Sequence, residues 1–207
     1  GTWTQTGAGS FDWGAAANWS GSTIADGADF TASFSANITA AQTINLDAAR
    51  TIGNIVATDG THDYTISGGN ILTLDRTGGA IPVINVTAVG RALTISSVIA
   101  GNDGLNKWGA GQLNLNGSAV NTFTGGVKVS SGTLNLDFAN LATPTDLINS
   151  GNTLTLGGGR LQIWPVVENG SGGAPTATPR AKAGGFAHTS APSGAAPIPE
   201  LMTPSQV

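Results

Sequence analysis

A three-residue phrase recurs along the chain at nearly constant spacing. Each copy places one aliphatic residue on either side of a Thr or an Asn, and the copies begin at Leu72, Leu93, Leu113, Leu134 and Leu154. A glycine stands shortly before each copy. A regular repeat of about 20 residues is typical of solenoid folds. The ten aliphatic positions are Leu72, Leu74, Leu93, Ile95, Leu113, Leu115, Leu134, Leu136, Leu154 and Leu156.

The alternation within each copy predicts a short β-strand, since successive side chains of a strand point to opposite faces. The two aliphatic residues would face inward, and the Thr or Asn between them would face outward. No segment shows the period of a capped helix. We therefore expect an all-β chain that forms a right-handed parallel β-helix with coils of about 20–21 residues and one interior ladder of these aliphatic residues. The alternative is an antiparallel sandwich, in which turns recur roughly every 8–12 residues.

The composition excludes several classes of partner and site. Charged residues make up 10% of the chain, the net charge is −4, and the eight basic residues are scattered singly. We therefore expect no nucleic-acid partner. Cysteine is absent, which excludes disulfides and thiolate metal sites. No apolar run approaches the roughly 20 residues of a transmembrane helix, so no transmembrane segment is expected.

One stretch resembles a known family. The sequence GAGQLNLNG at 109–117 is followed by NTFTGG at 121–126 and by SGTL at 131–134. Together these phrases resemble the autotransporter-associated β-strand repeat, which occurs in large bacterial surface and secreted proteins. The close match covers 107–136, with weaker echoes from 71 to 156. The resemblance implies a passenger-type β-solenoid that is secreted or held at the cell surface.

The two ends of the chain differ from the middle, so we expect three regions. Residues 1–35 would form the first coils and a cap, in which Trp3, Trp13 and Trp19 cover the open end of the core. The alternative interpretation of these tryptophans is a platform that stacks on sugar rings or contacts another subunit. Residues 36–167 would form the solenoid repeats.

Residues 168–207 are dominated by proline, alanine and glycine and show no strand period. We expect them to form an extended tail. Its apolar residues would anchor it along a groove; they are Phe186, Ile198, Leu201 and Met202.

The polar residues do not form a recognisable catalytic set. The aspartates share no period that would stack two carboxylates as in a glycosidase. His62 and Asp63 are neighbours, but adjacent strand residues face opposite ways, so we interpret them as part of a loop. We predict no catalytic, cofactor-binding or metal-binding residues, no cofactor, and no enzyme activity.

We expect an extracellular structural protein that self-assembles head to tail into a filament, with its tail contacting the neighbouring subunit. Unpaired strand edges at the ends of a solenoid invite such contacts, and a contact of this type repeats without closing. The alternative function is an adhesin-type β-helix module that binds a surface polysaccharide. Cleavage of carbohydrate is the weaker form of that alternative, since it needs a carboxylate pair.

Overall fold

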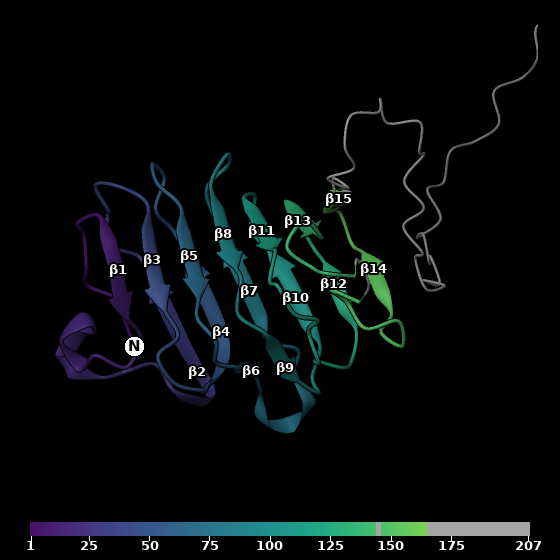
Figure 1. The fold of residues 1–207 in the computed structure, drawn as a ribbon, viewed down its shortest axis with the longest axis horizontal. Helices are drawn as coiled ribbons and strands as arrows, with labels where there is room; N and C mark the ends of the chain where they lie inside the picture. Colours follow the sequence, from purple (N-terminus) through teal and green to yellow (C-terminus); the bar gives the residue numbers. More distant parts are fainter. Residues whose placement is uncertain (144–145, 165–207) are drawn as a thin grey trace, which may run out of the picture.

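The chain folds into a parallel β-solenoid (Figure 1), seen in a computed structural model that describes residues 1–143 and 146–164. All pairings between its named strands are parallel, so the all-β solenoid is confirmed and the antiparallel sandwich is wrong. The strands are β1 (Gly9–Asp12), β2 (Gly27–Phe34), β3 (Gln42–Asn45), β4 (Arg50–Ala57), β5 (Tyr64–Ser67), β6 (Leu72–Leu74), β7 (Val83–Val86), β8 (Ala92–Ile95), β9 (Ile99–Gly101), β10 (Leu105–Trp108), β11 (Gln112–Leu115), β12 (Val127–Val129), β13 (Thr133–Asp137), β14 (Leu154–Leu156) and β15 (Arg160–Trp164). Short 3-10 turns are η1 (Ala16–Asn18), η2 (Ser20–Ser22) and η3 (Thr77–Gly79).

Two sheets run along the solenoid. Sheet 1 has the order β1-β3-β5-β8-β11-β13-β15, and each successive coil adds one strand to it. Sheet 2 has the order β14-β12-β10-β7-β4-β6-β9, with β2 also paired to β4. The first half of β4 pairs with β6 and its second half pairs with β7, so sheet 2 divides into two sides at this strand. In Figure 1 the strands of sheet 1 stand in sequence from β1 at one end to β15 at the other.

The core lies between the sheets and follows the alternation of the strands. In β8 and β11 every second side chain is buried, while the residues between are partly exposed. Residues at one register position stack from coil to coil, as expected for in-register parallel strands. One such interior ladder in sheet 1 consists of Ile44, Ile66, Ile95, Leu115 and Leu136.

The expectation of a single ladder from five equally spaced copies is wrong. Only the copies that begin at Leu93, Leu113 and Leu134 pair with one another, in sheet 1. The first copy, Leu72 and Leu74, lies in β6 of sheet 2. It pairs there with β9 rather than with β8.

The last copy lies in sheet 2 as well. Leu154 pairs with Val127 in β12, and the position equivalent to Leu134 in the next coil is Leu161 of β15. Leu154 is half-buried and Leu156 is exposed, whereas the other eight aliphatic residues are buried. Alternation along a strand separates inside from outside, but it does not identify the side of the coil on which the strand lies.

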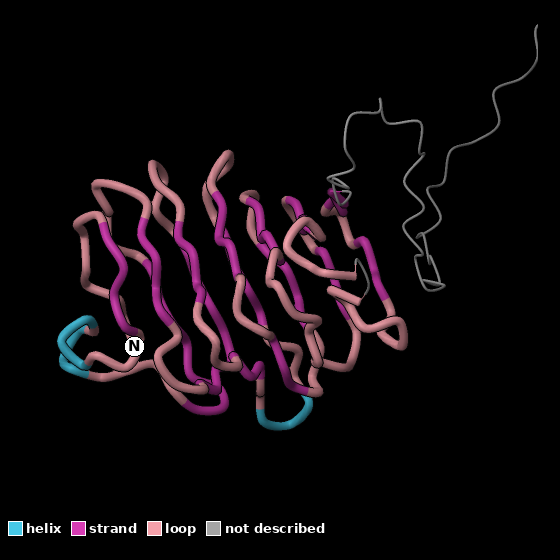
Figure 2. The backbone as a smooth tube through the Cα atoms, viewed as in Figure 1, coloured by secondary structure: helices cyan, strands magenta, loops and turns pink. Residues whose placement is uncertain are grey.

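The coils also differ in length, which explains the error. The paired residues Leu93, Leu113 and Leu134 follow one another at nearly equal steps, but the step from Tyr64 to its partner Leu93 is markedly longer. Most of the extra residues lie at the corner between β6 and β7, which includes η3 and is drawn as the lower cyan turn in Figure 2. The expected period therefore holds in the middle of the solenoid and fails on either side.

Residues 1–35, expected to form the first coils and a cap, contain β1 and β2, which are strands of sheets 1 and 2. The predicted tail at 168–207 and its four anchors, Phe186, Ile198, Leu201 and Met202, lie outside the described residues.

Candidate functional site

A buried lysine lies inside the solenoid between β10 and the following coil. The residues of β10 alternate, so Lys107 faces the interior on the same side as Leu105 and is fully buried. Its Nζ donates to the backbone carbonyls of Trp108 and Gly109, each at 2.8 Å, and to that of Ser131 in the next coil at 3.3 Å. One ammonium group thus satisfies carbonyl groups of two consecutive coils.

Burial lowers the pKa of Lys107 from its ordinary value of 10.5 to about 8, because the charged form loses its hydration. Its oxygen ligands are neutral carbonyls, and no ion pair of Lys107 occurs in the described part of the chain. The side chain therefore acts as a structural cation and not as one half of a salt bridge.

Glycines make room for this arrangement at the corner. Gly109 has a φ of +83° and Gly132 a φ of +66°, a region that favours glycine. A Cβ atom at Gly132 would collide with the carbonyl oxygens of Gly109 and Gly111 and would press on Nζ of Lys107. The corner can close around the ammonium only because these positions have no side chains.

Asn121 connects three consecutive coils. Its Oδ1 accepts from the backbone N–H of Ile99 at 2.8 Å, and its Nδ2 donates to the backbone carbonyl of Leu147 at 2.9 Å. One coil further along, Nδ2 of Asn152 donates to the carbonyl of Phe123 at 3.2 Å. Asn121 and Asn152 are both buried, so these amides replace water at a corner where the strand ladder is interrupted.

A second amide ladder runs along the outside of sheet 1. Nδ2 of Asn114 donates to Oγ1 of Thr94 at 3.1 Å, and Nδ2 of Asn135 donates to Oδ1 of Asn114 at 3.2 Å. These three residues are the middle residues of their phrases and occupy one register position in β8, β11 and β13. The ladder joins coils from outside as Lys107 and Asn121 do from inside.

The three N-terminal tryptophans close one end of the core. Trp3, Trp13 and Trp19 are at most 2% exposed, and they pack edge to face or tilted around Phe34. The ring centroids of Trp3 and Trp19 are 5.0 Å apart. Each indole N–H has an acceptor, as buried tryptophans require: Oε1 of Gln42 for Trp3, and backbone carbonyls for the other two.

This burial decides between the two interpretations of the tryptophans. A sugar ring would need an exposed indole face, and none of the three offers one. The sugar-stacking platform is therefore wrong at these positions, and the buried cluster has the geometry of a cap.

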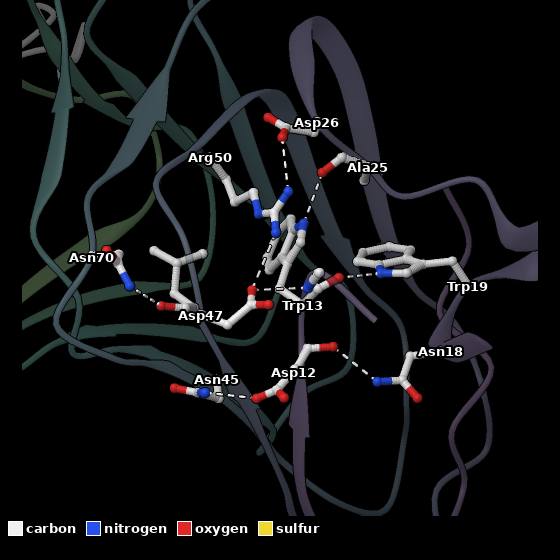
Figure 3. A network of polar contacts seen from close by, with 12 residues as sticks. Asp12, Trp13, Asn18, Trp19, Ala25, Asp26, Asn45, Asp47, Arg50 and Asn70 are labelled. Atoms are coloured by element: carbon white, nitrogen blue, oxygen red, sulfur yellow. Dashed lines mark hydrogen bonds and ion pairs between the residues drawn. The ribbon is translucent and has the colours of Figure 1, made fainter. Parts of the chain in front are cut away.

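A polar network surrounds this cap (Figure 3). Arg50 contacts Asp26 at 3.0 Å and Asp47 at 3.2 Å, and Oδ1 of Asp47 also accepts from the backbone N–H of Gly14. Figure 3 shows Asp12 joined to Asn45 and Asn18 beneath the same cluster. These bonds tie the N-terminal turns to β3 and β4, and the guanidinium of Arg50 is paired with two carboxylates.

The one His–Asp neighbour pair in the chain is part of a loop. Asp59 is the residue that organises this loop, since its carboxylate accepts from the backbone N–H groups of Ile38, Thr61 and His62. These bonds hold the pKa of Asp59 below its usual value, against the opposing effect of burial. Nδ1 of His62 lies 2.8 Å from Oγ1 of Thr61, whereas Oδ1 of Asp63 accepts from the backbone N–H of Ala92. The two side chains thus have separate partners and do not form a relay.

Among residues 1–143 and 146–164, no three His, Cys, Asp or Glu side chains gather closely enough to hold a metal ion. Over the same part of the chain, no helix is long and apolar enough to cross a membrane.

Comparison with known proteins bears on the segment that contains Lys107 and Asn121. Residues 105–136, from the start of β10 to the penultimate residue of β13, match the passenger-associated transport repeat. The chain carries an autotransporter-associated repeat. This confirms the resemblance inferred from the motifs at 109–134.

The chain is also similar to part of a curated autotransporter protein. It is 38% identical over 117 residues to the adhesin BmaC autotransporter of Brucella suis biovar 1 (strain 1330). The alignment covers 50% of this chain and 3% of that adhesin, so the chain spans a small part of its relative's length. No solved structure matches the chain.

The repeat contains the coil-joining residues that sequence reasoning missed. Lys107 and Asn121 lie within it, as do Gly109 and Gly132. For Lys107 a signal was present, because the alternation from Leu105 places both residues on one face of the strand. For Asn121 there was none beyond its place in the family phrase, since the residue lies outside the named strands.

Proposed function

We propose that the chain is a structural, non-enzymatic segment of an extracellular passenger, in which stacked coils form a rod that presents adhesin-type surfaces. The observation that carries this proposal is the passenger-associated repeat at 105–136, whose buried Lys107 joins two coils. Similarity to a stretch of an autotransporter adhesin supports the extracellular location. A structural rod requires coils that stay stacked. Lys107 and Asn121 serve this purpose, because their side chains form hydrogen bonds between coils.

Labelling of intact cells tests the location. An epitope inserted at the exposed corner 118–120 should be bound by antibody on intact producing cells and removed by external protease. An epitope-tagged cytoplasmic protein in the same cells is the control and should be protected. Labelling that requires lysis of the cells would contradict an extracellular role.

We also propose end-to-end self-assembly, which a specific feature of the C-terminal end favours. β14 and β15 are the last strands of their sheets at this end, and their outer edges have no strand partner within the described residues. Leu156, Ile163 and Trp164 are 39–53% exposed there. An open strand edge with apolar side chains is the kind of surface that pairs with another chain.

At the N-terminal end, the structure changes which surface would contact the neighbouring subunit. Because the N-terminal tryptophans are buried, they offer no apolar surface to a neighbour, and the contact would use the free edge of β1 instead. The role of the tail as a strap across the neighbouring subunit stays a prediction.

Sedimentation velocity and electron microscopy test this assembly. Ile163→Lys should abolish any filament, whereas Ile81→Lys, at an apolar residue of similar exposure on a corner, should not. Deletion of 168–207 should leave a folded monomer if the tail is the strap. If the chain of residues 1–207 stays monomeric at high concentration, self-assembly is refuted and the passenger role is left intact.

A further inference from the structure

A shallow groove crosses the strands of sheet 1 near their amino-terminal ends. Four paired residues from successive coils line it, namely Ala92, Gln112, Thr133 and Arg160. The remaining lining comes from the corners that precede β8 and β11 and includes Val89 and Arg91. The groove has a volume of about 290 Å³. Three strand spacings separate its ends, so its floor is roughly 14 Å long and runs along the solenoid axis.

The groove concentrates positive charge in a protein that is acidic overall. Among the residues that the structure describes, both charged residues of the lining are arginines and no carboxylate belongs to it. Arg160 is exposed and forms no ion pair or side-chain hydrogen bond within the described part of the chain. Arg91 uses Nη1 for the carbonyl of Thr61 at 2.6 Å and lies 3.7 Å from Asp63. These contacts leave Nε and Nη2 of Arg91 available for a ligand.

The other groups of the groove suit a ligand rich in hydroxyl groups. Nε2 of Gln112 donates to Asn114, so its Oε1 remains as an acceptor. Thr133 adds a hydroxyl group, which both donates and accepts. Val89, which is 81% exposed, provides an apolar wall. Guanidinium groups bind carboxylates through paired hydrogen bonds.

The structure favours a polysaccharide over other polyanions. Peptides are commonly bound at strand edges, in apolar helix grooves or on aromatic surfaces. The floor of this groove is instead the outward face of sheet 1, where β8, β11 and β13 are paired on both edges and, of the four strands that line it, only β15 has an outer edge without a partner in the described part of the chain. Nucleic acid would need many phosphate contacts, and two arginines supply too few. We propose that this groove binds a carboxylated polysaccharide, with Arg160 and Arg91 contacting uronate groups and Gln112 and Thr133 contacting hydroxyl groups.

This proposal names a ligand class for the proposed adhesin-type role. It rests on that role, because an extracellular location is what would bring the chain into contact with a polysaccharide. Binding itself is measured on the purified chain, and surface labelling of cells is measured separately, so the two ideas can fail independently.

Calorimetric titration with short oligogalacturonate and alginate oligomers tests the groove. The methyl-esterified oligogalacturonate is the matched neutral ligand, and a polyglutamate peptide and free galacturonate are the competing sources of carboxylate. We expect binding of at least one oligouronate, weakened about tenfold or more by Arg160→Gln and by Arg91→Gln. Lys128→Gln, which removes an exposed cation from β12 in sheet 2, should leave the affinity unchanged.

Several results would overturn the proposal. They are the absence of binding to both oligouronates, equal binding of the methyl ester or of polyglutamate, equal binding of free galacturonate, and an equal loss in Lys128→Gln. Circular dichroism and thermal unfolding of each variant establish that lost binding is not lost folding. Since Arg160 is exposed in an outer strand, its replacement should not disturb the fold.

Discussion

Replacement of Lys107 by Met removes one ammonium group from the interior and keeps a flexible apolar chain of similar length. In the folded protein the carbonyl oxygens of Trp108, Gly109 and Ser131 would each lose a donor. The apolar part of the side chain would still fill its place beside Leu105. The change therefore isolates the contribution of the hydrogen bonds between the coils from that of packing.

The size of the effect follows from these three carbonyl groups. A buried polar group that loses its partner costs about 1–3 kcal/mol. The loss is partly offset, because the variant no longer buries a charge at the expense of its hydration. We therefore expect Lys107→Met to lower the free energy of unfolding by about 2–4 kcal/mol.

Urea denaturation followed by circular dichroism measures this loss, and hydrogen exchange locates it. Exchange should accelerate first at Ser130, whose N–H donates to the carbonyl of Lys107, and in the neighbouring coil. Lys128→Met is the control, because Lys128 lies in the next coil on the exposed face of β12 and should change stability by less than about 0.5 kcal/mol. If Lys107→Met is as stable as the parent, or if both variants lose the same stability, the ammonium does not join the coils.

Three further predictions concern the same coils. The pKa of Lys107 is lowered to about 8 in the folded state, so between pH 8 and 10.5 the unfolded chain binds more protons than the folded chain. The free energy of unfolding of the parent, measured relative to that of Lys107→Met, should therefore rise over this pH range. A flat or falling difference would exclude the lowered pKa. Asn121→Leu should cost about 2–4 kcal/mol in urea denaturation, since it leaves Ile99 N–H and the carbonyl of Leu147 unpaired, and a neutral result would mean that water replaces the amide. Leu115→Asp should abolish the strand signal in circular dichroism, while Asn114→Asp on the outer face should retain it; similar behaviour of the two would contradict the assigned faces.

The class of fold could be predicted because alternation along a strand is a local property. The pair Leu113–Leu115 shows it clearly, since both leucines are buried and Asn114 between them is partly exposed, and the coil from Leu113 to its partner Leu134 keeps the expected length. The position of a strand on the perimeter of a coil is not local, since it depends on the length of every corner before it. This is why Leu72 and Leu154 matched the pattern and yet lie in the other sheet.

The roles of single residues were harder to predict. A lysine in a strand is usually solvated, so the inward position of Lys107 is evident only when the corner carbonyls that receive its ammonium are known. The three N-terminal tryptophans had two plausible uses, and only the packing around Phe34 decides between them. The groove that ends at Arg160 combines residues of four coils, and its register could not be read from a period that fails after Leu136.

The unequal coils have a mechanical consequence. A rod anchored at one end and pulled at the other carries tension through its stacked strands in series, so coils should detach one after another from the end. A short coil such as that from Leu93 to Leu113 would add about 70 Å of extended chain when it detaches, whereas the longer coil that contains Thr77 would add about 100 Å. Lys107 and Asn121 resist this peeling at the shortest coils, where each rupture yields the least length. Under load the rod would therefore lengthen in uneven steps, and the coils around the repeat would hold while others give way.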